Sequence, residues 1–377
     1  MSNAPEPDQV DARHMRHALV LAARGLGNVW PNPAVGCVIV KEGRVIARGH
    51  TQPGGRPHAE AVALERAGEA ARGATVYVTL EPCAHQGKTP PCAAALVKAG
   101  VARVVSALED PDPRVAGRGH EMLRRAGIAV ETGVLAGEAA ALNRGFLMRV
   151  RAGRPMLTLK LATSFDGRIA TATGESRWIT GAAARREVHL MRARHDAVMV
   201  GGATARADDP ALTVRGLGIR RQPVRIVVSR ALDLPLSGKL AATARDVPLW
   251  ICHGSGAPQE LRAAFEGLGA RLIEVPSRPR GMLDVGAMMQ ALGEAGLTRI
   301  FCEGGAGLAA SLLGADAVDD LVGFTAGLVL GGDGLPAIAP LGRARLAQAP
   351  RFRLAEARAI GGDVMHRWER ARGESPC

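Results

Sequence analysis

Apolar residues recur at two different spacings in the first 150 positions of the chain. Recurrence every three or four residues indicates a helix, and short apolar runs bounded by turn residues indicate buried strands. These rules predict helices over residues 11–25, 60–71, 91–99 and 119–126, and strands over 35–40, 45–49, 75–80, 101–107 and 128–131. A chain that alternates strand and helix in this order folds into a central sheet covered by helices.

A second alternation follows residues 149–155, a polar, turn-rich segment that we interpret as a linker. It predicts strands over 156–162, 197–200, 224–228, 249–252 and 299–302, with helices over 185–194 and 308–313. The second half does not repeat the first, and 377 residues are enough for two domains. We therefore expect two α/β domains, over residues 1–152 and 153–377.

The formal net charge of +12 rests almost entirely on arginine, because only five of the 48 basic residues are lysines. An excess of positive charge raises the local concentration of anionic ligands such as phosphates. Nucleic acid is a less favoured ligand, because the chain has no dense basic run and only 3% aromatic residues to stack on bases. We expect a small anionic ligand and no nucleic acid partner.

Targeting and redox features indicate the cytoplasm. The first 11 residues are polar and acidic, without the apolar centre of a signal peptide. No stretch reaches the run of about 18 apolar residues that a membrane helix needs. The six cysteines are spread along a long chain, which argues against a disulfide framework. We expect a cytoplasmic protein with no membrane partner.

The first half contains the residue types of a catalytic zinc site. His58-Ala59-Glu60 is followed by Pro82-Cys83 and then by Cys92. One imidazole and two thiolates are the zinc ligands of deaminases, in which a glutamate near the histidine moves protons without binding metal. Glu60 has the position of that glutamate, and it can take a proton from water and pass it to a leaving amine. The two cysteines are nine positions apart, whereas the general deaminase signature separates them by three.

Two other interpretations of these ligands remain open. A closed structural zinc site needs a fourth ligand, which His85 or Cys37 could supply. Cys83 and Cys92 could also be two buried thiols without metal. The segment between them favours catalysis, because it places His85 and Lys88 beside the metal, where they suit an anionic and polar substrate.

Residues 31–40, 58–60 and 79–92 together resemble the deaminase half of the bifunctional riboflavin-biosynthesis deaminase/reductases, in which the long cysteine spacing is the family's own pattern. The resemblance implies a cytidine deaminase-like α/β/α layered domain with one zinc ion per chain. It also implies a substrate, a diaminopyrimidinone carrying ribose 5-phosphate, whose ring amino group is hydrolysed to a carbonyl. By position, the zinc ligands would be His58, Cys83 and Cys92, the catalytic proton carrier Glu60, and the substrate-binding residues Asn32, His50, His85 and Lys88.

Four segments of the second half have polar or glycine-rich turns next to predicted strands. Glycines at the start of a helix let a phosphate reach backbone N–H groups. The string from Gly305 to Ala310 formally fits a dinucleotide fingerprint, but the acidic residue expected about 20 positions later is missing. Because all four fall within one predicted domain, we expect them to share a pocket. They are residues 160–168, 174–180, 204–215 and 302–308.

The resemblance extends to these segments, which are similar to the family's reductase domain, a fold like that of dihydrofolate reductase. It implies NADPH as the second cofactor, hydride transfer to the ribose carbon, and a homo-oligomer, a dimer or tetramer joined through this domain. Arg192 and Arg215 would hold the substrate phosphate, for which a guanidinium fork is well shaped. Phe165 departs from the leucine expected in the family. The implied NADP-binding residues are Ala162, Trp178, Thr204, Asp208, Gly305, Ala306 and Gly307, and the implied substrate-binding residues are Ser176, Arg192, Leu212, Arg215 and Glu303.

Two further functions compete with a two-step enzyme of riboflavin precursor synthesis. A nucleic-acid or nucleoside deaminase with an accessory domain would explain the first half and the charge, but it would leave the second half without a role. A basic binding protein with a structural zinc would leave Glu60 unused. The two-step enzyme is therefore the function that the sequence favours.

Overall fold

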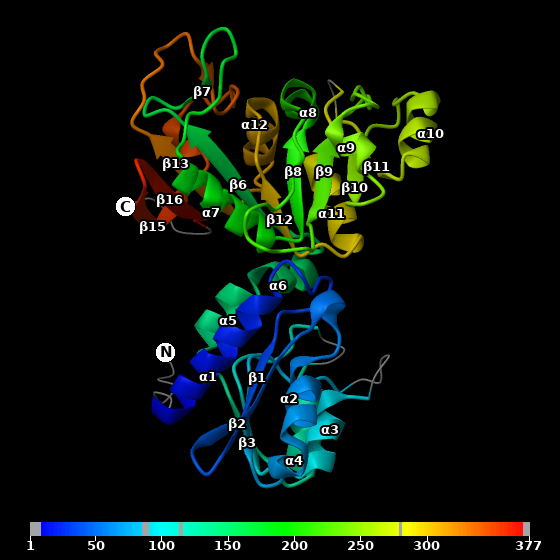
Figure 1. Ribbon diagram of the computed structural model, residues 1–377, viewed down its shortest axis with the longest axis vertical. Coiled ribbons are helices and arrows are strands. Elements are labelled where there is room, and N and C mark those ends of the chain that lie inside the picture. The colour runs from blue at the N-terminus through cyan, green and yellow to red at the C-terminus, as the bar shows by residue number, and fades with distance from the viewer. Residues whose placement is uncertain (1–8, 85–89, 113–115, 279–280, 372–377) are drawn as a thin grey trace. The chain divides into compact units, whose positions relative to one another are not determined.

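The computed structural model describes residues 9–84, 90–112, 116–278 and 281–371. The chain divides into two compact units, residues 1–153 and 154–377 (Figure 1). The division falls one residue from the predicted boundary. Among the described helices, none has both the length and the apolar character that crossing a membrane requires.

A mixed sheet of five strands forms the centre of the first unit, in the order β2-β1-β3-β4-β5. Strands β1 and β2 form an antiparallel hairpin at one edge of the sheet, and β1 also pairs with β3 in antiparallel register. The remaining strands run parallel, as the predicted strand–helix–strand order requires. The strands are β1 (Gly36–Lys41), β2 (Arg44–His50), β3 (Thr75–Val78), β4 (Arg103–Ser106) and β5 (Ala129–Thr132).

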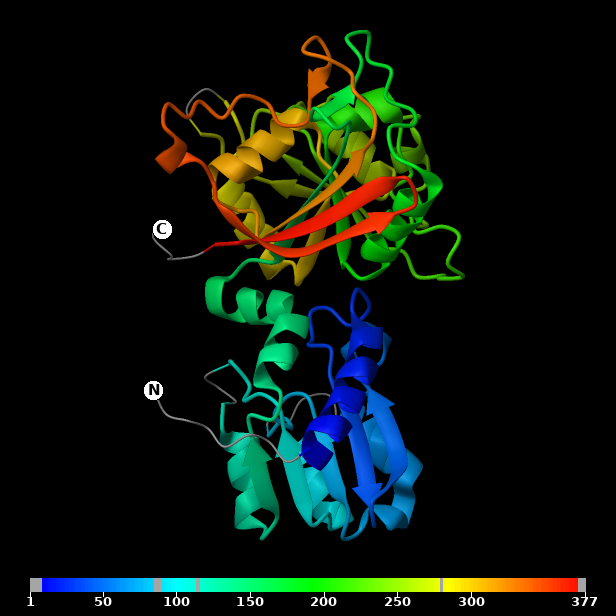
Figure 2. The ribbon, with the colours of Figure 1, turned by 90° about the vertical axis from the view of Figure 1, so that its left-hand side faces the viewer.

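Helices cover both faces of this sheet and bury two separate apolar cores. Met15, Ala18 and Leu19 of α1 pack with Ala139 of α5 in one core. The opposite core contains apolar residues of α2, α3 and α4. Figure 2 views the unit with α1 in front of the strands. The α/β/α layering predicted for this half is confirmed, with helices α1 (Gln9–Ala22), α2 (Ala59–Ala67), α3 (Cys92–Ala99), α4 (Arg118–Arg125), α5 (Ala136–Leu142) and α6 (Arg144–Ala152), and 3-10 turns at Ala23–Gly25, Pro53–Gly55 and Gly68–Ala71.

The interpretation of residues 149–155 as a linker is wrong for most of the segment. Residues 149–152 form the last turn of α6, which ends where Gly153 adopts a left-handed conformation with φ 69°. Arginine is a good helix former, so a polar and arginine-rich stretch does not by itself indicate a loop. Only residues 153–155 connect the helix to the next strand.

The second unit contains a sheet of nine strands in the order β11-β10-β9-β8-β12-β6-β13-β16-β15. Its first seven strands are parallel, and the hairpin β15–β16 joins them in antiparallel register. This hairpin lies in front in Figure 2. The strands are β6 (Met156–Thr163), β8 (Ala197–Gly201), β9 (Val224–Val228), β10 (Leu249–His253), β11 (Arg271–Glu274), β12 (Arg299–Cys302), β13 (Asp320–Ala326), β15 (Phe352–Ile360) and β16 (Asp363–Arg370).

Crossover helices connect the parallel strands, and their apolar faces pack against the sheet. A separate two-stranded ladder joins β7 (Arg168–Ala170) to β14 (Leu335–Pro336). The helices are α7 (Ala182–Ala193), α8 (Gly202–Asp208), α9 (Lys239–Ala242), α10 (Gln259–Gly267), α11 (Val285–Glu294) and α12 (Ala306–Gly314), with a 3-10 turn at Leu346–Gln348.

The order of the strands brings the predicted site segments together. β12 lies between β6 and β8, and all three run in the same direction. Their carboxyl ends therefore meet at one edge of the sheet, where ligands of α/β folds bind. The segments that begin at Ser164, Gly202 and Glu303 all start from this edge.

Candidate active sites

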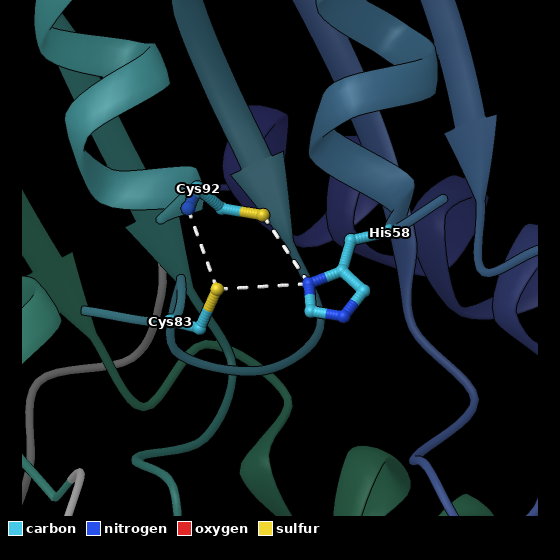
Figure 3. Close-up of side chains that lie close together, drawn as sticks. All are labelled: His58, Cys83 and Cys92. Atoms are coloured by element: carbon cyan, nitrogen blue, oxygen red, sulfur yellow. Dashed lines mark hydrogen bonds between the residues drawn. The ribbon is translucent and has the colours of Figure 1, made fainter. Parts of the chain in front are cut away.

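Three side chains of the first unit converge on one point (Figure 3). The Nδ1 atom of His58 lies 3.6 Å from Sγ of Cys83 and 3.3 Å from Sγ of Cys92. His58 immediately precedes α2, Cys92 is the first residue of α3, and Cys83 lies in the loop after β3. The backbone N–H of Cys92 donates to Sγ of Cys83 at 3.3 Å, which stabilises a thiolate.

Close packing fixes the start of α2, where His58 and Glu60 lie. A Cβ atom at Gly49 of β2 would stand only 2.1 Å from the carbonyl oxygen of Ala59. The first turn of α2 can therefore press directly on the sheet only because residue 49 is glycine. The next turn buries Ala63 in the same core.

The three ligand atoms fit a zinc ion. Zinc bonds of about 2.3 Å to sulfur and about 2.0 Å to nitrogen, at tetrahedral angles, separate a sulfur from a nitrogen by about 3.5 Å. The two distances from His58 are close to that value. Among the described residues the group has three members and does not include Cys37, which is fully buried in β1. The three ligands found among the described residues leave one tetrahedral position for water, as in catalytic zinc sites.

Glu60 is buried beside these ligands, with 3% of its surface exposed. Burial raises the pKa of Glu60 to about 7, against the opposing charge of His58. A carboxyl group with such a pKa can both accept and release a proton near neutral pH. The position and the electrostatics of Glu60 therefore suit a proton carrier.

The loop that carries Asn32 is held in place from two sides. The side chain of Asn143, at the junction of α5 and α6, bonds to both backbone groups of Ala34, at 2.9 Å and 3.0 Å. Asn32 packs on the 3-10 turn that leads to His58, because a Cβ atom at Gly55 of that turn would lie 1.8 Å from its Nδ2 atom. Within the described ranges, the amide of Asn32 has no hydrogen-bond partner, so it remains available to a ligand.

Of the other residues predicted for this pocket, the structure describes His50 alone. His50 ends β2 and is half-buried, and burial together with Arg24 and Arg66 holds its pKa below the ordinary value. A neutral imidazole at this position can donate one hydrogen bond and accept another. His85 and Lys88 lie outside the described residues.

Sequence reasoning missed Glu81, which anchors the loop of Cys83. Its buried carboxylate accepts backbone N–H bonds from residues 110, 117, 119 and 120, at 2.8–3.3 Å. A Cβ atom at Gly119 would lie 1.9 Å from the carbonyl oxygen of Pro82. The start of α4 is thus bound directly to the strand end that presents the zinc ligand. A buried acidic residue next to the Pro-Cys pair was the available signal.

In the second unit, a glycine-rich turn joins β12 to α12. The backbone N–H of Gly305 donates to Oγ1 of Thr204 at 3.2 Å, and a Cβ atom at residue 305 would lie 2.7 Å from that oxygen. Gly304 has a φ of 88°, and the space around Gly307 is open. The glycines at 304, 305 and 307 thus keep the start of α12 largely clear of side chains, which suits the pyrophosphate of a dinucleotide.

Of the predicted NADP-binding residues outside this turn, Thr204 contacts it directly. Trp178 is 70% exposed, and the guanidinium of Arg185 lies 4.5 Å from its ring centre. The loop of Trp178 approaches α8, because Arg177 donates to the carbonyl oxygen of Asp208 at 3.4 Å. Ala162 lies in β6 and packs on the core beneath.

The predicted substrate-binding residues Arg192 and Glu303 form an ion pair with two bonds, at 2.5 Å and 3.0 Å, and both side chains are nearly buried. Burial alone would raise the pKa of Glu303, but the charge and hydrogen bonds of Arg192 outweigh it and hold the pKa low. Lys160 of β6 interacts with the same carboxylate, and its pKa is lowered by burial. Sequence reasoning placed Lys160 in a candidate segment but missed it as a site residue.

Leu212 and Arg215 flank a short segment after α8. The side chain of Leu212 is buried in the apolar core, with a φ of 52°, so it contacts other core residues. Arg215 is exposed, and Ser176 is half-buried in the loop before Trp178. The structure therefore presents Arg215 to solvent, whereas Leu212 faces inward.

The first unit has the layering and the three-ligand metal geometry of a zinc deaminase, and the second has the parallel sheet and glycine cradle of a dinucleotide-dependent enzyme. Comparisons with known proteins agree with this class. Residues 8–108 match the cytidine and deoxycytidylate deaminase zinc-binding region, and residues 155–366 match the RibD C-terminal domain.

Similarity extends along nearly the whole chain. The riboflavin biosynthesis protein RibD of Escherichia coli is 44% identical, over 94% of this chain and 98% of the relative. A solved structure of Acinetobacter baumannii RibD has a TM-score of 0.86 and 39% identity, over 96% of this chain and 99% of that one. A Thermotoga maritima diaminohydroxyphosphoribosylaminopyrimidine deaminase/5-amino-6-(5-phosphoribosylamino)uracil reductase has a TM-score of 0.83 and 33% identity, over 96% and 99%.

The chain belongs to the RibD family. It is a bifunctional enzyme of riboflavin biosynthesis, with a zinc-dependent deaminase in the first unit and an NADPH-dependent reductase in the second. Its substrate is a small molecule.

Proposed function

We propose that this enzyme deaminates a diaminopyrimidinone carrying ribosylamine 5′-phosphate and then reduces the ribosyl group to a ribityl chain. The observation that carries the proposal is the set of three zinc-fitting ligand atoms beside the buried Glu60. The reductase step gives the second unit a role in the same reaction sequence.

In the first step, we assign zinc binding to His58, Cys83 and Cys92. Zinc held by these residues would lower the pKa of water, so that hydroxide could form and attack the ring carbon that carries the amino group. Glu60 takes a proton from that water and delivers it to the departing nitrogen, so that ring C–NH2 and water become a ring carbonyl and ammonia. Asn32 and His50 bind the substrate, as do His85 and Lys88, for which no position is described.

In the second step, the segment from Gly305 to Gly307, with Thr204, Trp178, Asp208 and Ala162, binds the cofactor. NADPH, when bound, supplies the hydride that reduces the ribosyl carbon. The open space around Gly307 at the start of α12 supports this assignment, because a pyrophosphate can approach the backbone there. Substrate binding is assigned to Ser176, Arg215, Glu303 and Arg192, and to the backbone of Leu212, because the side chain of Leu212 is buried in the core. The ion pair of Arg192 with Glu303 favours orienting Glu303 over holding the phosphate.

The decisive experiment replaces one carboxylate. Glu60→Gln keeps the shape of the side chain but cannot carry the proton, so ammonia release should fall by at least about a hundredfold. Zinc content should stay at one ion per chain, measured by atomic absorption. NADPH oxidation with the already deaminated substrate serves as the control and should be unchanged. If ammonia release survives, or if zinc is lost, the role assigned to Glu60 is wrong.

We further propose a cytoplasmic homo-oligomer, a dimer or tetramer joined through the reductase unit. The exposed apolar side chains of Phe165, Leu328 and Val329 support such an interface, since the first two residues share a backbone hydrogen bond of 2.7 Å. Light scattering of the purified protein gives the mass directly. A monomer at micromolar concentration would contradict the assembly.

A further inference from the structure

An arginine of α7 holds the indole ring of Trp178 from one side. The guanidinium carbon of Arg185 lies 4.5 Å from the centre of that ring, which is within the range of a cation–π contact. Nη1 of the same guanidinium donates to the carbonyl oxygen of Thr180 at 2.6 Å. A single side chain therefore fixes both the ring and the backbone two residues after it.

A second anchor fixes the end of the loop that carries Trp178. Oδ2 of Asp363, the first residue of β16, accepts the backbone N–H of Gly181 at 2.7 Å. Gly181 immediately precedes α7, so this buried carboxylate also lies at the positive end of the helix dipole. The turn between β15 and β16 packs on the first turn of α7, since a Cβ atom at Gly361 would lie 3.2 Å from Cβ of Ala183. The loop thus ends on a fixed support.

The other side of Trp178 is attached to the helix that contacts the glycine-rich turn. Arg177 donates to the carbonyl oxygen of Asp208 at 3.4 Å, and Thr204 accepts the backbone N–H of Gly305. Both acceptors belong to α8, and positions 204 and 208 are about 6 Å apart along the helix axis. About one helical turn therefore separates the attachment of the Trp178 loop from that of the glycine-rich turn.

The exposure of the Trp178 ring suits it to a ligand. Trp178 keeps 70% of its surface exposed, and Arg185 lies over only one of the two faces of the indole. An exposed aromatic face that is held in one orientation can stack on a planar ring of a ligand. Ordering a side chain during binding costs affinity, and a side chain that is ordered beforehand avoids that cost.

We propose that Arg185 is a positioning residue of the reductase, which holds the Trp178 ring in place before NADPH binds. A planar ring of the cofactor then stacks on the face of the indole that Arg185 leaves free. The proposal rests on the proposed function, which assigns Trp178 to NADP binding, and it adds the residue that orders Trp178. Arg185 acts through the ring and does not itself contact the cofactor.

Three variants separate positioning from the effect of charge. Arg185→Ala removes both the ring contact and the bond to Thr180. Arg185→Lys keeps the positive charge, but an ammonium group lacks the planar fork that stacks on the indole while it bonds the backbone. Arg186→Ala is the matched control, because it removes the same charge from the next position of the same helix. The guanidinium of Arg186 is exposed and has no hydrogen bond or ion pair with any residue that the structure describes.

The assay follows NADPH oxidation by the full chain with the deaminated ribosylamino-pyrimidine 5′-phosphate. KM for NADPH should rise about threefold to tenfold in Arg185→Ala, the combined effect of a lost cation–π contact and a lost hydrogen bond. The rise in Arg185→Lys should be at least about twofold, and Arg186→Ala should not change KM. KM for the pyrimidine should stay constant in all three variants. Ammonia release by the first unit controls for folding and should also stay constant.

Two further measurements report on the ring itself. In a chain that already carries Trp178→Ala, the additional change Arg185→Ala should not raise KM for NADPH further, because Arg185 acts through that ring. The emission of Trp178, obtained as the difference between a protein and its Trp178→Phe variant, reports on the mobility of the indole. Acrylamide should quench this emission more strongly in Arg185→Ala than in the native protein, whereas Arg186→Ala should leave the quenching unchanged.

Four results would overturn the proposal: a native KM for NADPH in Arg185→Ala, a native KM in Arg185→Lys, an equal rise in Arg186→Ala, and additive effects of Arg185→Ala and Trp178→Ala. The second and third of these would assign the effect to charge alone. If Trp178→Ala leaves KM for NADPH unchanged, the assignment of Trp178 to the cofactor fails together with this proposal. If Trp178→Ala raises KM and Arg185→Ala does not, this proposal alone fails.

Discussion

Gly54 and Gly55 provide a sharp test of the pocket residue Asn32. Both glycines have left-handed backbone conformations, with φ of 77° and 82°. A Cβ atom at Gly54 would meet nothing within 4 Å, whereas one at Gly55 would lie 1.8 Å from Nδ2 of Asn32. Alanine at either position carries a similar backbone strain of about 1–2 kcal/mol. Only Gly55→Ala also displaces the amide.

The size of the effect follows from the contact distance. A carbon and a nitrogen that are not bonded stay about 3.4 Å apart, so the amide of Asn32 must move by roughly 1.5 Å. Such a shift breaks a hydrogen bond to the substrate, which is worth about 1.5–3 kcal/mol if the acceptor is charged. KM for deamination should therefore rise at least about tenfold in Gly55→Ala, whereas Gly54→Ala should change it by less than about threefold.

The assay measures ammonia release against substrate concentration and zinc content in the same preparations. Asn32→Ala gives the largest loss of activity to be expected, because Gly55→Ala acts through the Asn32 side chain. Gly55→Ala should therefore lose no more activity than Asn32→Ala. Combining the two substitutions should add little further loss. Equal effects of Gly54→Ala and Gly55→Ala would refute the reasoning, since backbone strain would then explain both. Loss of zinc in Gly55→Ala alone would also refute it.

Three further predictions test the two halves separately. Removing zinc with a chelator should abolish ammonia release but leave NADPH oxidation with the deaminated substrate intact, and a parallel loss of both would contradict separate sites. Thr204→Val removes the acceptor of the Gly305 N–H, so KM for NADPH should rise about threefold to tenfold while KM for the pyrimidine stays constant. Burial and then Arg299 lower the pKa of His195 to about 3, so the folded protein keeps this ring neutral while the unfolded chain binds a proton below about pH 6.5. Stability should thus fall by up to about 1.4 kcal/mol for each pH unit from about 6.5 towards 3, and urea unfolding of His195→Gln should show a smaller pH dependence than that of the native chain.

The spacing of apolar residues was sufficient to predict the sheet of the first unit. Its predicted strands all occur within one or two residues of their observed bounds. The central strands β1, β3 and β4 are runs of mostly buried, valine-rich residues between turns. Helices α5 and α6 were missed. Residues 136–142 are mostly alanine, which favours a helix but shows no polar face, and the arginines of α6 resembled a linker.

The zinc site was predictable because its ligands form a recognisable short sequence pattern. His58, Cys83 and Cys92 follow a pattern whose residue types already imply zinc, and the structure brings them together. The pairing of Arg192 with Glu303 spans 111 positions and depends on α7 lying beside the end of β12. Both residues were predicted as site residues from the sequence, but the sequence does not indicate that they form an ion pair with each other. Such partners are determined by the order of strands in the sheet, which no short motif encodes.

The anchoring of Glu81 has a consequence for how this protein can vary among species. Its carboxylate is held by four backbone N–H groups, and every residue except proline offers such a group. The side chain at position 110 can therefore vary without moving Cys83, whereas Gly117 has a φ of 75°, a left-handed conformation that favours glycine. Gly119 is restricted as well, because any side chain there would meet the Pro82 carbonyl, so substitution at either glycine should be rare in functional relatives. A loop that varies in sequence can thus support a metal site whose geometry stays constant.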